Sequence, residues 1–239
     1  MITKQELLEF IRTRRALFSD GSMGTVLNQR LPAIQSCLDC ANLSHPQIVA
    51  SVHRDYLEAG SDMIQTNTFG ANRFKLAAQG SEDQLPEINK AAVEIARRAI
   101  QSSDRAAFLA GDIGPLGVRL APFGRVQLPE AREAFAEQIS VLVEAGVDLL
   151  IMETITDLYE IVEAINAARQ VASDIPVIAS MTYTRDNRTL LGDPPAKVAR
   201  RLHEAGADVI GVNCSGGPNQ ILNILKLMRQ AVPDALFSV

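Results

Sequence analysis

The chain repeats one short pattern three times, and this repeat constrains the fold more than any other feature of the sequence. Each copy reads Glu-Ala-Gly-x-Asp, followed by a mostly apolar run and a polar pair, and the copies cover 58–68, 144–154 and 204–214. Glycine readily adopts the left-handed conformation that ends a helix. The apolar run lacks clean alternation, as in a strand covered on both faces. Each copy therefore predicts a helix end, a turn and a buried strand, and together they predict a parallel sheet.

Four further apolar segments fit the scheme as strands, at 16–19, 107–111, 176–182 and 235–239. Helical periodicity predicts helices between the strands, at 47–59, 85–101, 129–145, 158–171, 195–205 and 220–231. Seven strands alternating with helices predict one α/β domain over 1–239, with a doubly wound open sheet as the competing architecture. We favour a (β/α)₈ TIM barrel that ends at strand seven, because the polar pairs then converge on one face.

Charge and hydropathy narrow the range of partners. The net charge of −5 argues against a nucleic-acid or anionic-membrane partner. No apolar run approaches the roughly 20 residues that a membrane span needs. The first 18 residues carry charges throughout, unlike a signal peptide. We therefore expect a cytoplasmic protein with reduced cysteines, without nucleic-acid or membrane partners.

Polar residues follow the three repeated strands. They are Thr66-Asn67-Thr68, Glu153-Thr154 and Asn213-Cys214. In a barrel, the carboxyl ends of the strands carry the functional side chains. Glu153 follows four apolar residues, so its carboxylate needs a partner near the barrel mouth, and we favour a functional role over a structural salt bridge. Cys214 taken alone is more typical of a buried apolar thiol.

Two glycine-containing segments also follow predicted strands, at 19–25 and 111–115. Backbone N–H groups of the first segment can approach a small anion such as a carboxylate. An Asp-Gly pair after a strand is also common as a simple turn, so neither segment is decisive alone.

Cys37 and Cys40 form a C-x-x-C motif that suggests zinc binding or redox chemistry. A zinc knuckle needs a second pair of ligands at suitable spacing, and the sequence has none. The flanks read as loop, whereas a redox motif belongs at a helix start. We therefore disfavour both roles, and we interpret His45, His53 and His203 as surface or packing residues.

Four segments, in this order and spacing, resemble the homocysteine S-methyltransferase family. They are DGSMGT at 20–25, QTNTFGAN at 65–72, GDIGP at 111–115 and GVNCSGGP at 211–218. The resemblance covers nearly the whole chain. GDIGP and residues 181–192 are most similar to the homocysteine-binding domain of cobalamin-dependent methionine synthase and its reductase-fused relatives.

The resemblance implies a (β/α)₈ barrel that transfers a methyl group to the homocysteine thiol and gives methionine, with zinc as cofactor. It places the substrate ammonium group at Asp20 and Glu153. It assigns the remaining substrate-binding positions to Gly21, Ser22, Met23, Gly24, Thr25, Thr66, Asn67 and Asn213, with the backbone of 21–25 at the substrate carboxylate. Cys214 matches one zinc ligand. Zinc coordination converts a thiol that is mostly protonated at neutral pH into a nucleophile.

The other two zinc ligands of the family are adjacent cysteines after the eighth strand, and we expect this chain to lack them and to be incomplete at its C-terminus. The implied methyl donor is methylcobalamin or methyltetrahydrofolate on another module, or S-methylmethionine. An alternative is a degenerate amino-acid-binding barrel that has lost its zinc site. A third possibility is a barrel enzyme of unrelated function that uses Glu153 as a base. This possibility would require the four motif matches to be accidental.

Overall fold

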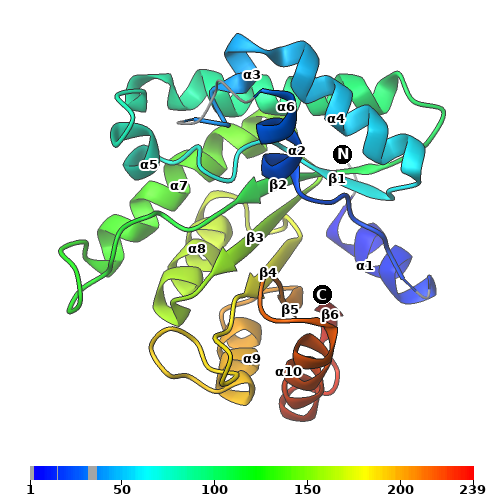
Figure 1. The fold of residues 1–239 in the computed structure, drawn as a ribbon. Coiled ribbons are helices and arrows are strands. Elements are labelled where there is room, and N and C mark those ends of the chain that lie inside the picture. The colour runs from blue at the N-terminus through cyan, green and yellow to red at the C-terminus, as the bar shows by residue number, and fades with distance from the viewer. Residues whose placement is uncertain (1–2, 15, 32–36) are drawn as a thin grey trace.

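The computed structural model describes residues 3–14, 16–31 and 37–239 (Figure 1). Its sheet has six parallel strands in the order β1-β2-β3-β4-β5-β6. They are β1 (Met63–Gln65), β2 (Phe108–Ile113), β3 (Leu149–Ile155), β4 (Val177–Met181), β5 (Val209–Val212) and β6 (Leu236–Ser238). Strand order follows chain order without the reversal of a doubly wound sheet, so the topology is that of a (β/α)₈ barrel. Within the described ranges, no pairing joins β6 to the N-terminal segment and closes the barrel.

The six predicted helices are confirmed. They are α4 (Pro46–Ala59), α6 (Leu85–Gln101), α7 (Leu128–Ala145), α8 (Leu158–Val171), α9 (Pro195–Glu204) and α10 (Pro218–Ala231). The structure adds α1 (Lys4–Thr13), α2 (Met23–Arg30), α3 (Ala41–Ser44), α5 (Arg73–Ala77) and the 3-10 helix η1 (Glu82–Gln84). Helices α7 and α8 pack on one side of the sheet, and α1 lies on the other side (Figure 1).

The strand predicted at 16–19 is wrong as a full strand. Only Ser19 pairs, as an isolated parallel bridge to Met63. The carbonyl oxygen of Phe18 accepts from the backbone N–H of Asp62 at 2.8 Å and that of Met63 at 3.2 Å. Among the described residues, the backbone bonds of 16–19 join only Phe18 to Asp62 and Met63, so the ladder is too short to extend over the whole segment.

The repeat folds as its sequence predicts. Its three glycines, Gly60, Gly146 and Gly206, have φ values of 107°, 94° and 98°, in the left-handed region. Its three aspartates each accept a backbone N–H from the neighbouring segment: Asp62 from Phe18, Asp148 from Leu109, and Asp208 from Val177. Each copy therefore ends a helix and also ties the start of its own strand to the preceding one.

The core has an outer and an inner part. The outer part fills the space between the sheet and the surrounding helices. The inner part is an apolar cluster of strand residues that alternate with the outward-facing ones, together with Leu7 of α1. Its buried members are Leu7, Met63, Ala110, Leu149, Ile151, Ile178 and Val209. Leu7 is 1% exposed, so α1 covers the interior at the amino ends of the strands. No helix in the described part of the chain is long and apolar enough to span a membrane.

Candidate active site

Strand alternation places two carboxylates above the inner apolar cluster. On β2 the side chain of Ala110 faces inward, so Asp112 two residues later faces inward as well. On β3, Leu149 and Ile151 face inward, and Glu153 is the next inward position. The Cα atoms of Asp112 and Ile151 are in register, which puts Glu153 one inward position beyond Asp112 on the adjacent strand. The carboxyl end of the barrel interior is therefore acidic.

Glu153 is held by residues of two strands. Its Oε2 accepts from Nδ2 of Asn213 at 2.6 Å and from the Thr154 hydroxyl at 3.0 Å. The same Nδ2 also donates to Thr154 Oγ1 at 2.8 Å, and Asn213 Oδ1 accepts from the Thr154 backbone N–H at 3.0 Å. Burial raises the pKa of Glu153, and the Thr154 hydrogen bond opposes this rise. Asn213 thus orients Glu153 across the mouth.

Two non-glycine residues in this network have left-handed backbones. Thr154 has φ 58° at the end of β3, and Cys214 has φ 47° just after β5. This conformation is costly for a β-branched residue such as threonine. The free thiol of Cys214 is exposed and directly follows Asn213. The chain therefore turns sharply at both strand ends, next to the residues that the sequence assigns to the site.

Asp20 lies beside β1. Its Oδ2 accepts from the Gln65 backbone N–H at 2.9 Å, and its Oδ1 accepts from Gln65 Nε2 at 3.2 Å and from the Ser19 hydroxyl at 3.0 Å. Burial raises the pKa of Asp20 to about 6, the hydrogen bonds oppose this rise, and the charge of Glu153 adds to it. The predicted ammonium-binding pair, Asp20 and Glu153, is close enough to interact electrostatically.

The segment 21–25 forms the start of α2. Ser22 is the N-cap, and its Oγ accepts from the Thr25 backbone N–H at 3.2 Å. Met23, Gly24 and Thr25 form the first helical turn, where N–H groups and the helix dipole favour an anion. A Cβ at Gly21 would lie 2.9 Å from Oη of Tyr56, so the backbone packs too closely there for a larger residue.

Thr66 and Asn67 are buried, and their side chains bond to protein groups. The Thr66 hydroxyl accepts from the Asp112 backbone N–H at 3.0 Å. The Thr68 hydroxyl donates to the Asp112 carbonyl at 2.7 Å, so Thr66 donates to Thr68 across their 2.6 Å contact. Asn67 Nδ2 donates to the Leu38 carbonyl at 2.8 Å. These side chains fix the walls of the site.

The sequence does not assign Asp112 to the site, although GDIGP follows a predicted strand. The structure places Asp112 inside β2, 7% exposed, with no hydrogen-bond partner for Oδ1 among the described residues. Burial raises its pKa well above the usual range, and the charges of Glu153, Asp39 and Asp20 raise it further. Alternation along β2 places Asp112 on the inward face, two residues after Ala110. The sequence could have identified Asp112 only if it had shown that the strand continues to this residue.

Cys37 and Cys40 form a disulfide, so the expectation of reduced cysteines is wrong for this pair. Their Cα atoms are 5.2 Å apart, within the range that a disulfide spans. The flank is not purely loop, because Cys40 is the N-cap residue of α3. The turn between the two cysteines contacts the site, since Asn67 donates to Leu38 and the Gly70 backbone N–H donates to Asp39 Oδ1 at 2.9 Å.

The zinc ligand set is incomplete in the structure. Cys214 is the free cysteine, and the described residues contain no group of three His, Cys, Asp or Glu side chains placed to hold a metal ion. A tetrahedral zinc site needs at least three protein ligands. The residues described here therefore do not form a zinc site by themselves.

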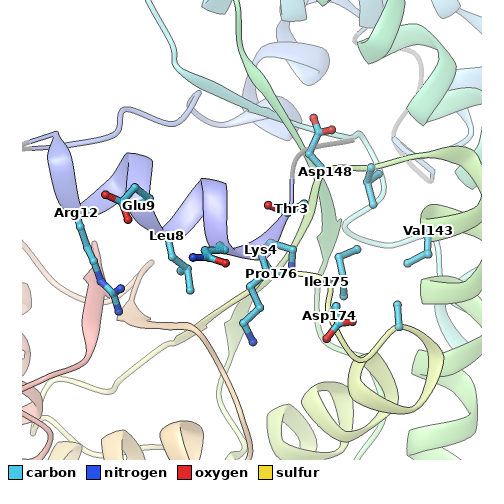
Figure 2. Close-up of a pocket in the computed structure, with 13 residues that line it drawn as sticks. Thr3, Lys4, Leu8, Glu9, Arg12, Val143, Asp148, Asp174, Ile175 and Pro176 are labelled. Atoms are coloured by element: carbon cyan, nitrogen blue, oxygen red, sulfur yellow. The ribbon is translucent and has the colours of Figure 1, made fainter.

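A cavity of about 680 Å³ lies at the other end of the sheet (Figure 2). Lys4, Leu8 and Arg12 of α1 line one side, and Asp148 and Pro176, just before β3 and β4, line the other. Catalytic groups of barrels gather at the carboxyl ends of the strands, whereas residues at the amino ends serve stability. The site residues predicted from the sequence, Glu153 and Asn213, lie at the opposite end of the sheet from this cavity.

Comparison with known proteins identifies the family of the chain. The family model for homocysteine S-methyltransferase matches residues 17–239. The chain belongs to this family. The family resemblance seen in the sequence is thus confirmed, and its curated members that match include homocysteine methyltransferases.

Two curated relatives and one solved structure show how far the likeness extends. Methionine synthase of Mycobacterium tuberculosis is 30% identical over 95% of this chain, which spans 20% of that protein. Betaine–homocysteine S-methyltransferase 1 of Mus musculus is 32% identical over 97% of the chain, which spans 56% of that protein. The metallated homocysteine methyltransferase MmuM from Escherichia coli superposes with a TM-score of 0.80 at 22% identity, covering 94% of this chain and 83% of that one. At 22% identity, the comparison with MmuM supports the fold alone.

Proposed function

We propose that this chain forms the homocysteine-binding barrel of a methyltransferase that methylates the homocysteine thiol and gives methionine. The observation that carries the proposal is the half-buried carboxylate of Glu153, joined through Asn213 to the turn that presents the Cys214 thiol. Buried carboxylates favour a cationic ligand group, because a buried charge without a partner is costly. An amino acid with a thiol at its far end matches both features.

Each part of the substrate has a partner in this proposal. Glu153 and Asp20 bind the ammonium group, and Asn213 holds Glu153 in place. The backbone from Gly21 to Thr25, including Ser22, Met23 and Gly24, binds the carboxylate at the start of α2. Thr66 and Asn67 shape the wall on the β1 side through the hydrogen bonds of their side chains. The substrate thiol then points toward Cys214.

We propose zinc as the cofactor, with Cys214 as one ligand and the remaining ligands outside the described residues. Zinc, if bound, would supply thiol activation. In this proposal, the described residues of the chain bind the substrate and orient its thiol. The methyl donor is methylcobalamin or methyltetrahydrofolate carried on another module, or S-methylmethionine. The protein acts in the cytoplasm, without nucleic-acid or membrane partners.

A second candidate is an amino-acid-binding barrel without a metal. The lack of a group of three potential metal ligands in the described ranges is compatible with this candidate, which keeps the proposed amino-acid site and has no metal. The two functions differ in whether ligand binding depends on zinc. Binding of homocysteine that is strengthened by zinc and lost with a chelator supports the methyltransferase.

Calorimetric titration of the chain with L-homocysteine and with L-homoserine, which carries a hydroxyl in place of the thiol, tests the proposal. We expect homocysteine to bind more tightly, and Glu153→Gln to lower its affinity about tenfold or more. The matched control is Glu133→Gln, an exposed carboxylate on α7 that should bind as the wild type does. Equal binding by wild type and Glu153→Gln would refute the assigned site.

A further inference from the structure

Asp112 combines a fixed backbone with an unpartnered side chain. Its N–H donates to Thr66 and its carbonyl accepts from Thr68, so the two threonines hold both backbone groups where β1 has ended. Its carboxylate is 7% exposed, and Oδ1 has no partner among the described residues. A buried acceptor left unpaired costs roughly 1–3 kcal/mol. A carboxylate with a purely structural role would be expected to have its own partner here.

The charged groups around Asp112 leave it open to a cation. Glu153 on β3, Asp20 beside β1 and Asp39 in the disulfide turn repel it, and Lys75 on α5 attracts it. The Lys75 ammonium group, however, lies over the ring of Phe69, 4.4 Å from its centroid. It forms no salt bridge with Asp112 within the part of the chain that the structure describes. Among the described residues, none of the three carboxyl groups of Asp20, Asp112 and Glu153 has a cationic side chain as a salt-bridge partner.

The carboxylates of Asp20, Asp112 and Glu153 come from three of four neighbouring positions around the mouth, and β1 is the position between Asp20 and Asp112. Asp20 follows the Ser19 bridge, Asp112 belongs to β2, and Glu153 belongs to β3. Parallel strands bring inward side chains of neighbouring strands within reach of one another. A protonated amine carries three N–H donors, which matches three carboxylate acceptors arranged around one point.

We propose that Asp112 is a third carboxylate that binds the α-ammonium group of the substrate, together with Asp20 and Glu153. The proposal rests on the proposed function and deepens it, since it makes the pocket selective for ligands with a free, protonated α-amino group. The hydrogen bonds from Thr66 and Thr68 then support substrate binding, because they fix the backbone that carries this carboxylate.

The test compares L-homocysteine with 4-mercaptobutanoate, which has the same carbon chain, carboxylate and thiol but no amino group. Wild-type chain, Asp112→Asn and Glu133→Gln are titrated with each ligand by calorimetry. We expect Asp112→Asn to bind homocysteine about ten- to one-hundredfold more weakly than the wild type. Its affinity for 4-mercaptobutanoate should be unchanged or higher, because a buried negative charge has been removed. Glu133→Gln should behave as wild type toward both ligands.

The outcomes separate this inference from the proposed function. If the wild type prefers homocysteine and Asp112→Asn keeps that preference, the role of Asp112 is wrong while the proposed function stands. If the wild type binds neither ligand, or binds both equally, the proposed function fails and this inference fails with it. Thermal melting of the unliganded proteins checks the fold. Asp112→Asn should melt at or above the wild-type temperature, and a large decrease would indicate a structural role instead.

Discussion

Nδ2 of Asn213 donates a 2.6 Å hydrogen bond to Oε2 of Glu153, so the turn after β5 positions a carboxylate on β3. The two residues are 60 positions apart in sequence, and they occupy the same place in two copies of the repeat. The repeat therefore places equivalent residues at the ends of alternate strands, where they meet. In the proposed function, Asn213 is a positioning residue that acts on the substrate through Glu153.

Replacing Asn213 by alanine should lower homocysteine affinity about tenfold, because Glu153 loses a charge-assisted hydrogen bond and its fixed orientation. Affinity for 4-mercaptobutanoate should change much less, since that ligand has no ammonium group. Calorimetry with both ligands checks this. Asn223→Ala, at an exposed position of α10, is the control. An equal loss for both ligands would point to general disruption of the site.

Homocysteine affinity should increase as pH rises from 5 to 7. The pKa of Asp20 is raised to about 6, so this carboxyl is mostly neutral at pH 5 and ionised at pH 7, while the ligand stays an ammonium ion. Titrations at several pH values should show this increase in the wild type and a flatter profile in Asp20→Asn. An identical pH profile in the variant would remove Asp20 from the binding account.

Glu160 should make the protein less stable as pH rises. Burial raises its pKa from 4.5 to about 7, although Oε1 accepts from the Leu116 backbone N–H at 2.7 Å. The folded state then binds the proton more tightly than the unfolded state, so stability falls between about pH 4.5 and 7. The loss is on the order of 2–3 kcal/mol. Urea unfolding at pH 5 and pH 7 should show a smaller difference for Glu160→Gln than for the wild type.

Arg97 should stabilise the second copy of the repeat, which contains Asp148. Its guanidinium contacts both carboxylate oxygens of Asp148, at 3.1 and 3.2 Å, and also donates to the Gly146 carbonyl. Asp148 is 9% exposed, so Arg97→Met leaves a buried carboxylate without its cation and should cost about 1–3 kcal/mol in urea unfolding. Arg98→Met is the control, because the Arg98–Glu94 pair is largely exposed and should contribute less than about 1 kcal/mol. Equal costs would refute the structural role of Arg97.

The disulfide between Cys37 and Cys40 determines how many thiols can react and contributes to the free energy of unfolding. Denatured, unreduced protein should react with a thiol reagent at one cysteine, Cys214, and reduced protein at all three. Replacing Cys37 and Cys40 by serine should lower the free energy of unfolding by about 2 kcal/mol, because the closed loop is short. Three reactive thiols without reductant would show that the pair is not joined.

The repeat made much of this arrangement predictable. Its glycines and aspartates identify where three strands begin, and counting along each strand brings Glu153, Asn213 and Cys214 to the same end of the sheet. The helices at 85–101 and 158–171 are confirmed at both boundaries because their periodic patterns are long. Local sequence patterns are sufficient to predict these helices and strand starts, because the residues of each segment determine its structure.

The remaining features depend on contacts between distant segments. The Ser19 segment is apolar enough for a strand, but it is bonded to one neighbour only. Asp112 lies just beyond the strand predicted at 107–111, and the structure extends this strand to Ile113, where Thr66 and Thr68 bond to the backbone of Asp112. The joining of Cys37 to Cys40 depends on backbone geometry that the spacing alone does not specify.

A crystal structure of the chain with bound L-homocysteine tests the central claim most directly. The account predicts the ligand at the carboxyl ends of the strands, with its ammonium group within hydrogen-bond distance of Glu153 and Asp20 and its sulfur directed toward Cys214. Density for the ligand in the cavity between α1 and the segments before β3 and β4, with an empty acidic mouth, would contradict the account.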